Sequence, residues 1–207
     1  MITLVAAVAF AFGSGGFALG ARRDAPPTAD VGFLRDMIVH HEKAVEMSQI
    51  VIGSDLPAGA QTFVLEVISD QRYEIGLMET TLRRWGAATE APEGQSMAWM
   101  GEPTDAESMP GMATEADLGR LAAAEGSAAA EQWFQLMSVH HQGGLAMAEA
   151  ALTRVKDPDV KALARRIARN QRIEINEYAA AAARIGVAAP TVTAPPGDAP
   201  PDHGGHP

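Results

Sequence analysis

Two pairs of adjacent histidines form the clearest chemical pattern in this sequence of 207 residues. Each pair stands between two methionines, and the second copy of the pattern follows the first after 137 − 37 = 100 positions. Four of the six histidines in the chain belong to these pairs. The two copies are Met37…His40-His41…Met47 and Met137…His140-His141…Met147.

Histidine and methionine together favour a metal site, and copper in particular. Imidazole binds copper, zinc, iron and nickel, whereas a thioether selects Cu(I). Zinc is the alternative, because it would use the histidines but has little use for methionine. A di-iron carboxylate centre is disfavoured, because it needs a glutamate three residues before a histidine and neither pair has one. The other hypothesis is a buried hydrogen-bond network that only fixes helix register.

Composition and the absence of other motifs argue against several other classes of protein function. The net charge of −10 argues against nucleic acid as a partner. The absence of cysteine excludes disulfides and thiolate sites. The sequence has no Ser/His/Asp arrangement, phosphate loop or cysteine nucleophile, so we expect a binding protein and no enzyme.

The elements that must position the histidines are helices. Apolar residues recur at helical spacing, and caps and glycines mark the ends of each segment. We predict a helix from Asp30, as N-cap, to about Ile52, and a second from about Ala58 to Trp85. A short helix over Glu115 to Glu125 precedes two more long ones, which end near Val155 and Ile185.

The repeat continues beyond the histidines. Gln71-x-x-Glu74-Ile75 in the second helix matches Gln171-x-x-Glu174-Ile175 in the last, again 100 positions later (171 − 71). Each half is therefore a helical hairpin, and two hairpins predict an all-α four-helix bundle. At 100° per residue, the histidines and methionines of each copy share one face, which should point inward. The middle of each hairpin then brings Gln71 and Glu74, or Gln171 and Glu174, to the histidines as partners in a second shell of hydrogen bonds.

The flanking segments divide the chain. Residues 1–23 form an apolar run ending in two arginines, which predicts a signal peptide or membrane anchor and hence a location outside the cytoplasm. Residues 24–29 are a predicted linker, 30–186 the bundle, and 187–207 a disordered Pro/Gly-rich tail. Within the bundle, residues 30–86 and 114–186 are the hairpins and 87–113 a methionine-rich crossover. Auxiliary metal ligands in the crossover and tail would be Met97, Met100, Met109, Met112, His203 and His206.

The repeated motif, together with Met109-Pro-Gly-Met112, resembles the domain-of-unknown-function 305 family of exported bacterial proteins over roughly residues 30–186. The resemblance implies a ferritin-like four-helix bundle. It also implies copper binding or copper tolerance, which is associated with some members. For a copper-binding chain we expect a copper-handling protein as a partner. The two copies differ at one place, where Gly143-Gly144 replaces Lys43-Ala44. The two half-sites are therefore expected to be unequal.

Overall fold

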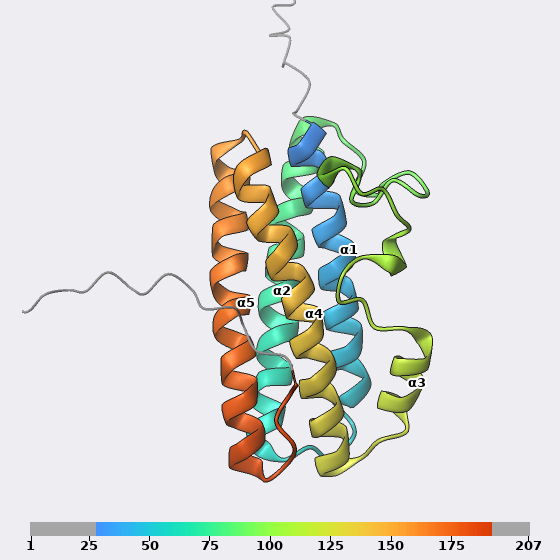
Figure 1. Ribbon diagram of the computed structural model, residues 1–207, viewed down its shortest axis with the longest axis vertical. Helices are drawn as coiled ribbons and strands as arrows, with labels where there is room; N and C mark the ends of the chain where they lie inside the picture. Colours follow the sequence, from blue (N-terminus) through green and yellow to red (C-terminus); the bar gives the residue numbers. More distant parts are fainter. Residues whose placement is uncertain (1–27, 192–207) are drawn as a thin grey trace, which may run out of the picture.

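The structure is a computed structural model that describes residues 28–191. Four long helices dominate it (Figure 1): α1 (Thr28–Val51), α2 (Ala58–Trp85), α4 (Gly126–Arg154) and α5 (Pro158–Ile185). A short helix, α3 (Glu115–Ala122), and two single 3-10 turns, η1 (Ala98–Met100) and η2 (Ala106–Ser108), lie in the connection between the hairpins. The described residues contain no strand, so the all-α prediction is confirmed.

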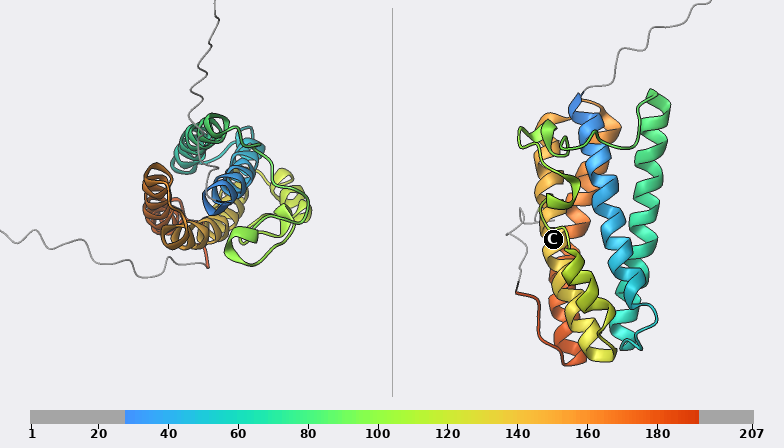
Figure 2. Two further views of the ribbon diagram at one scale, coloured as in Figure 1. Left: turned by 90° about the horizontal axis from the view of Figure 1, so that it is seen from above. Right: turned by 90° about the vertical axis from the view of Figure 1, so that its right-hand side faces the viewer.

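The four long helices form the bundle expected from the repeat. The helix α1 packs along α2, and α4 along α5, as two antiparallel hairpins. The hairpins meet mainly through α1 and α4, whereas α2 and α5 touch only sparsely. The crossover runs down the outside of the α1/α4 side, away from α2 and α5 (Figure 2). One side of the bundle is therefore covered by the crossover and the opposite side is not.

Local chemistry explains where the helices end. Gly86 and Gly186 both adopt positive φ, 67° and 76°, and cap α2 and α5 in the left-handed conformation that glycine tolerates best. Asp157 caps the start of α5 by accepting from the amides of Asp159 and Val160, and Pro158 follows as the first helical residue.

Asp30 has a different role from the predicted one. The helix α1 begins at Thr28, so Asp30 lies inside it, and the prediction of an N-cap at Asp30 and of a linker reaching residue 29 was wrong. The Asp30 carboxylate is fully buried and accepts from the backbone amides of Lys156 and Asp157, at 3.0 and 2.7 Å. It thus satisfies the turn between α4 and α5, which no local sequence pattern would indicate.

Replacing Asp30 by Ala should therefore lower the free energy of unfolding by about 2–3 kcal/mol, because two partly buried backbone amides lose their acceptor. Urea unfolding followed by circular dichroism measures the change. Glu42→Ala, at an exposed position of the same helix, is the matched control and should shift stability by less than about 0.5 kcal/mol. An equal loss in both variants would contradict the role given to Asp30.

A second buried aspartate fixes the crossover to α1. The Asp36 carboxylate accepts from the amide of Met97 at 2.7 Å and from the indole of Trp99 at 2.8 Å. Trp99 lies so close to Gly32 that a Cβ there would come within 2.7 Å of its ring. Burial raises the pKa of Asp36, and the hydrogen bonds from Met97 and Trp99 oppose that effect. The upper part of the crossover is thereby held against the bundle.

The bundle core is divided into two hydrophobic clusters. One contains Met37 and Met147, together with Phe33, Met78 and Leu82. The other contains aromatic side chains, Trp133, Phe134 and Tyr178 among them, with Met47 and Met137. The four histidines belong to neither cluster, although their side chains are fully buried. A polar layer with thioethers on both sides, as the repeat predicts, is what the structure shows.

The remaining predictions concern the two ends of the chain. No helix among residues 28–191 is long and apolar enough to span a membrane, and the predicted signal or anchor lies outside these residues. The predicted tail begins in contact with the bundle: Ala188 donates to Glu131, and Thr191 to Gln135. Residues 192–207, with His203 and His206, lie outside the described part of the chain.

Candidate metal centre

The paired histidines lie at the middle of the two central helices. His40 and His41 come from α1, and His140 and His141 from α4, and all four are 0% exposed. Adjacent residues on a helix point about 100° apart, so each pair spans an arc of the inner face. One histidine of each pair faces the other central helix, and the other faces the second helix of its own hairpin. The helix geometry alone therefore sorts the histidines into an inner and an outer pair.

The outer pair contacts the predicted glutamates. Nε2 of His41 lies 2.8 Å from Oε2 of Glu74, and Nε2 of His141 lies 2.8 Å from Oε2 of Glu174. Glu74 also accepts from Arg166 at 3.2 Å. In the second half the Tyr178 hydroxyl adds a contact of 3.1 Å to Nε2 of His141. Both carboxylates thus contact the same ring atom of their histidines, but their other partners differ.

The inner pair stacks and contacts backbone carbonyls of the crossover. The rings of His40 and His140 lie 3.8 Å apart between centroids, with an angle of 23°. Nε2 of His40 lies 3.0 Å from the carbonyl oxygen of Pro110, and Nδ1 of His140 lies 3.1 Å from that of Gly111. We call residues 109–112, Met-Pro-Gly-Met, the strap. The strap supplies acceptors that the sequence did not predict.

Each of the four rings keeps one nitrogen without a partner. Burial and the neighbouring groups leave Nδ1 of His40, His41 and His141, and Nε2 of His140, with no hydrogen bond. Buried polar groups in proteins are nearly always paired, because an unpaired one costs about 1–3 kcal/mol. In a network that served structure alone, four such nitrogens at one level of the core would be a large uncompensated cost.

Electrostatics keeps the inner pair neutral. Burial, together with the neighbouring His41, lowers the pKa of His40 to about 3, and the hydrogen bond to the Pro110 carbonyl opposes this shift. Burial also lowers the pKa of His140 well below its usual value, helped by the charges that His40 and His141 would carry. The unpartnered nitrogens of these two rings therefore hold lone pairs at neutral pH, which is the form that binds a metal.

The predicted thioethers surround this layer. Met37, Met47, Met137 and Met147 are all 0% exposed. Of the auxiliary candidates, Met97 and Met109 are buried in the cluster of Met37 and Met147, and Met100 and Met112 pack against it half-buried. Among the described residues, seven methionines therefore lie on one side of the histidine layer, namely Met37, Met78, Met97, Met100, Met109, Met112 and Met147. The other side has two, Met47 and Met137.

The glutamines of the repeat have no hydrogen bond to a histidine in the structure. Gln71 and Gln171 are buried, and Oε1 of each lacks a partner. Gln171 lies against Gly144, where a Cβ would come within 2.5 Å of Oε1 and 3.0 Å of the His40 ring. Gly144 therefore leaves the space in which Gln171 and His40 approach each other.

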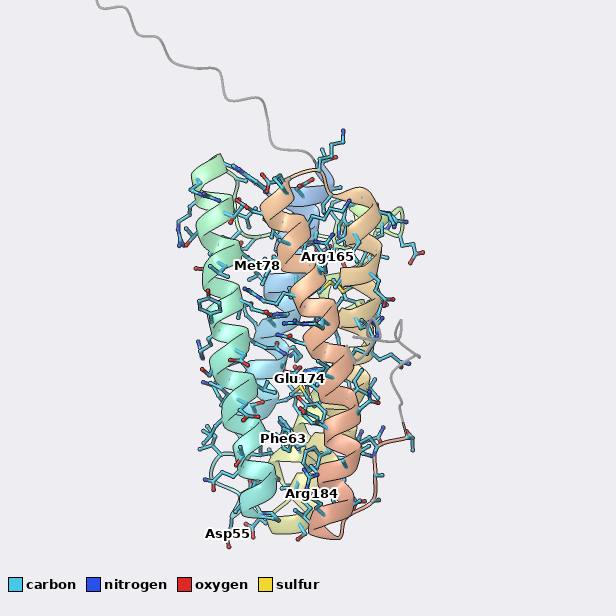
Figure 3. All side chains as sticks on the ribbon, turned by 90° about the vertical axis from the view of Figure 1, so that its left-hand side faces the viewer. Asp55, Phe63, Met78, Arg165, Glu174 and Arg184 are labelled. Atoms are coloured by element: carbon cyan, nitrogen blue, oxygen red, sulfur yellow. The ribbon has the colours of Figure 1, made fainter. Side chains whose placement is uncertain are left out.

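A small acidic groove opens beside the centre, between α2 and α5. Its volume is about 240 Å³, and Glu174 and Tyr178, which contact His141, also line it. Figure 3 faces this side of the bundle, with Glu174 at mid-height between the labelled Met78 and Phe63. Burial and the surrounding carboxylates raise the pKa values of Glu66 and Asp70 in the groove. The groove therefore links solvent to His141 through negatively charged side chains.

The histidines do not form a preassembled site for a metal with many nitrogen or oxygen ligands. No group of three or more histidine or carboxylate side chains within residues 28–191 is arranged to hold one ion. Convergence of all four rings on a common point is thus not observed. Thioether sulfurs are a separate ligand type, and they lie on both sides of the layer.

Comparisons with known proteins agree with this architecture. The model of a domain of unknown function, DUF305, matches residues 30–182. A DUF305 protein of Streptomyces coelicolor, thought to be secreted, is 35% identical, with a TM-score of 0.71 over 78% of this chain and 96% of its own. A DUF305 fragment from Deinococcus radiodurans is 28% identical, with a TM-score of 0.67 over 78% and 99%. No protein of curated function matches the sequence.

Structures of a protein named CopM share the fold at lower identity. Its Cu(I)-bound form is 24% identical, with a TM-score of 0.55 over 75% of this chain and 96% of that one. Its Cu(II)-bound form is 23% identical, with a TM-score of 0.53 over 72% and 92%. At this identity the likeness is one of fold.

Proposed function

The chain belongs to the DUF305 family, and we propose that it binds copper, as Cu(I), through the central histidines and the adjacent methionines. The proposal rests on the hydrogen-bond partners of the two nitrogens in each histidine ring. Each ring has one nitrogen within hydrogen-bond distance of a carboxylate or carbonyl and the other without any partner. Histidines that bind metals are held in this way, because the outer hydrogen bond orients the ring and makes the free nitrogen more basic.

Cu(I) fits the surrounding side chains better than zinc. Zinc takes a tetrahedral set of nitrogen, oxygen or thiolate ligands, and residues 28–191 hold no such set of histidines and carboxylates. Cu(I) accepts fewer ligands and prefers thioethers, which the core offers at Met37, Met47, Met137 and Met147. The copper-bound forms of CopM, which has the same fold, support copper as the metal, and one of them holds Cu(I).

We further propose that the protein works outside the cytoplasm, where it buffers copper, contributes to copper resistance or passes the ion to a copper-handling protein. The apolar N-terminal run and the Streptomyces coelicolor relative support an exported protein. The acidic groove between α2 and α5 supports cation entry from that side, because a negative cleft concentrates cations.

Titration of the metal-free protein tests the proposal. Under anaerobic conditions, Cu(I) should be bound and should compete with a chromophoric chelator, while Zn(II) should bind far more weakly. A variant with His40, His41, His140 and His141 all replaced by Ala should lose this Cu(I) binding. If the wild type binds Cu(I) no more tightly than this variant, the proposal is wrong. If this variant unfolds, the methionine-to-leucine variants described next test the proposal instead.

Replacing methionine by leucine distinguishes a copper site from a zinc site. Leucine has a similar volume, so Met37→Leu with Met147→Leu should cost less than about 1.5 kcal/mol each in stability. We expect a weaker Cu(I) affinity and an unchanged response to Zn(II). Met78→Leu, buried in the same cluster but outside the repeated motif, is the matched control. An equal effect of the control would refute the assignment of Met37 and Met147 as ligands.

A further inference from the structure

The strap contacts both inner histidines through two consecutive carbonyl groups. The oxygen of Pro110 lies 3.0 Å from Nε2 of His40, and that of Gly111 lies 3.1 Å from Nδ1 of His140. A carbonyl oxygen only accepts, so the ring nitrogen that faces it must carry the hydrogen. The strap therefore contacts Nε2 of His40 but Nδ1 of His140, although the two histidines occupy equivalent positions in the repeat.

A neutral imidazole has a single N–H. Both rings are fully buried, and the partner of each is an uncharged carbonyl, so no negative charge holds a second hydrogen on either ring. A hydrogen on Nε2 of His40 leaves Nδ1 bare, and a hydrogen on Nδ1 of His140 leaves Nε2 bare. These are the nitrogens that have no partner in the structure.

We propose that the strap selects opposite tautomers of His40 and His140, and so decides which nitrogen each ring offers to a metal ion. His40 offers Nδ1 and His140 offers Nε2. His41 and His141 both face their glutamates through Nε2 and offer Nδ1, so His140 differs from the other three. The choice of nitrogen as ligand rests on the proposed copper function, whereas the tautomers themselves do not.

The fit of the strap depends on Gly143, which only the second copy of the repeat contains, and on Gly111 within the strap itself. A Cβ at Gly143 would lie 2.0 Å from the Pro110 oxygen, so any side chain there displaces the strap. Gly111 has φ +80°, and a Cβ on it would lie 2.7 Å from the carbonyl oxygen of Val139. The first copy has Lys43 at the position that corresponds to Gly143. The strap can therefore lie over α4 and cannot lie in the same way over α1, which explains why it treats the two histidines differently.

Nuclear magnetic resonance of metal-free, 15N-labelled protein tests the proposal directly. Long-range correlations between ring nitrogens and ring protons distinguish the two neutral tautomers. We expect the Nδ1–H pattern for His140 and the Nε2–H pattern for His40, His41 and His141. An Nε2–H pattern for His140, or an Nδ1–H pattern for His40, would overturn the proposal. This measurement on the wild type decides the question even if a variant does not fold.

Gly143→Ala shows whether the strap is the cause. The Cβ should push the Pro110 carbonyl away, so that His40 and His140 lose their fixed patterns and exchange between tautomers, while the patterns of His41 and His141 persist. Gly76→Ala is the matched control, because Gly76 lies in α2 with no atom near its Cβ position. Unchanged patterns of His40 and His140 in folded Gly143→Ala would refute a selecting role of the strap.

Copper titration of the same variants separates this proposal from the proposed function. Loss of an outer hydrogen-bond partner typically weakens metal binding about 10- to 100-fold. Gly143→Ala should weaken Cu(I) binding by this factor, and Gly76→Ala should not. If the wild type shows the expected tautomers but binds no copper, the copper function is wrong and the selection by the strap stands. Equal copper affinity in Gly143→Ala and the wild type would overturn the link between tautomer and ligand.

Discussion

The metal-free protein should lose much of its stability between pH 6.5 and pH 5. His40 titrates at about 3 in the folded protein and near 6.5 when unfolded. Between these values the unfolded chain binds a proton that the folded chain does not, so stability falls as the pH falls. At pH 5, 1.5 units below 6.5, the loss from His40 alone is about 2 kcal/mol.

Other groups modify this loss. His140 acts in the same direction, because its pKa is also well below its unfolded value. Asp36 acts in the opposite direction, because its folded pKa is raised and its contribution grows as the pH falls. Its effect is confined to the acid range in which carboxylates titrate, so the histidines govern the upper part of the window. Against a typical total of 5–15 kcal/mol, a loss of this size is large.

Urea unfolding at a series of pH values measures this dependence. The pair of substitutions His40→Leu and His140→Leu should flatten the curve between pH 6.5 and 5, whatever it does to the stability at neutral pH. A curve that keeps its slope in this variant would assign the effect to other groups. Where the fold persists, Cu(I) binding at these two rings should hardly weaken down to about pH 5, because few protons compete for the lone pairs.

Removal of the glutamates should have the second large effect, this time on metal affinity. Glu74→Ala and Glu174→Ala each take away the carboxylate that contacts Nε2 of His41 or His141. The ring then loses its orientation and part of its basicity, which typically costs 10- to 100-fold in affinity. Competition with a Cu(I) chelator gives the affinity, and unfolding curves show whether the fold is intact.

The two positions should differ in their effect on stability. Removing Glu74 also leaves the half-buried Arg166 without the carboxylate to which it donates a hydrogen bond, so this variant should be the less stable one. The His141 ring retains a contact with Tyr178, so Glu174→Ala should be milder. Glu46→Ala, on the outer face of α1, is the control and should change neither quantity beyond about 0.5 kcal/mol. Unaltered copper affinity in both glutamate variants would show that the carboxylates do not support metal ligands.

The repeat made most of this fold predictable from sequence. A period of 100 residues that carries His-His and Glu to matching helical positions leaves few arrangements other than two packed hairpins. The same periodicity placed the histidines inside and brought Glu74 to His41 and Glu174 to His141. Side chains on regular helices have directions fixed by the backbone, which is why these contacts could be predicted.

What could not be predicted depends on backbone atoms and on irregular segments. The strap binds through the carbonyls of Pro110 and Gly111, and any residue type has a carbonyl, so the sequence carries no mark of this role. Asp30 looked like a helix cap because aspartate caps helices locally, yet its carboxylate satisfies amides 126 and 127 positions away. Gly143-Gly144, which departs from the repeat where the strap passes, was a clue to the position of the strap but not to its hydrogen bonds.

The single strap also limits how the molecule could be simplified by design. A symmetric protein assembled from two copies of the first hairpin would restore the repeat but would place a lysine at the position of Gly143. The Cβ of that lysine would lie 2.0 Å from the backbone of the strap. Two copies of the second hairpin would offer two docking positions to a crossover that occurs once. The two hairpins are therefore not interchangeable, although the sequence repeats. The centre is enclosed only when the first hairpin, the crossover and the second hairpin follow one another in this order.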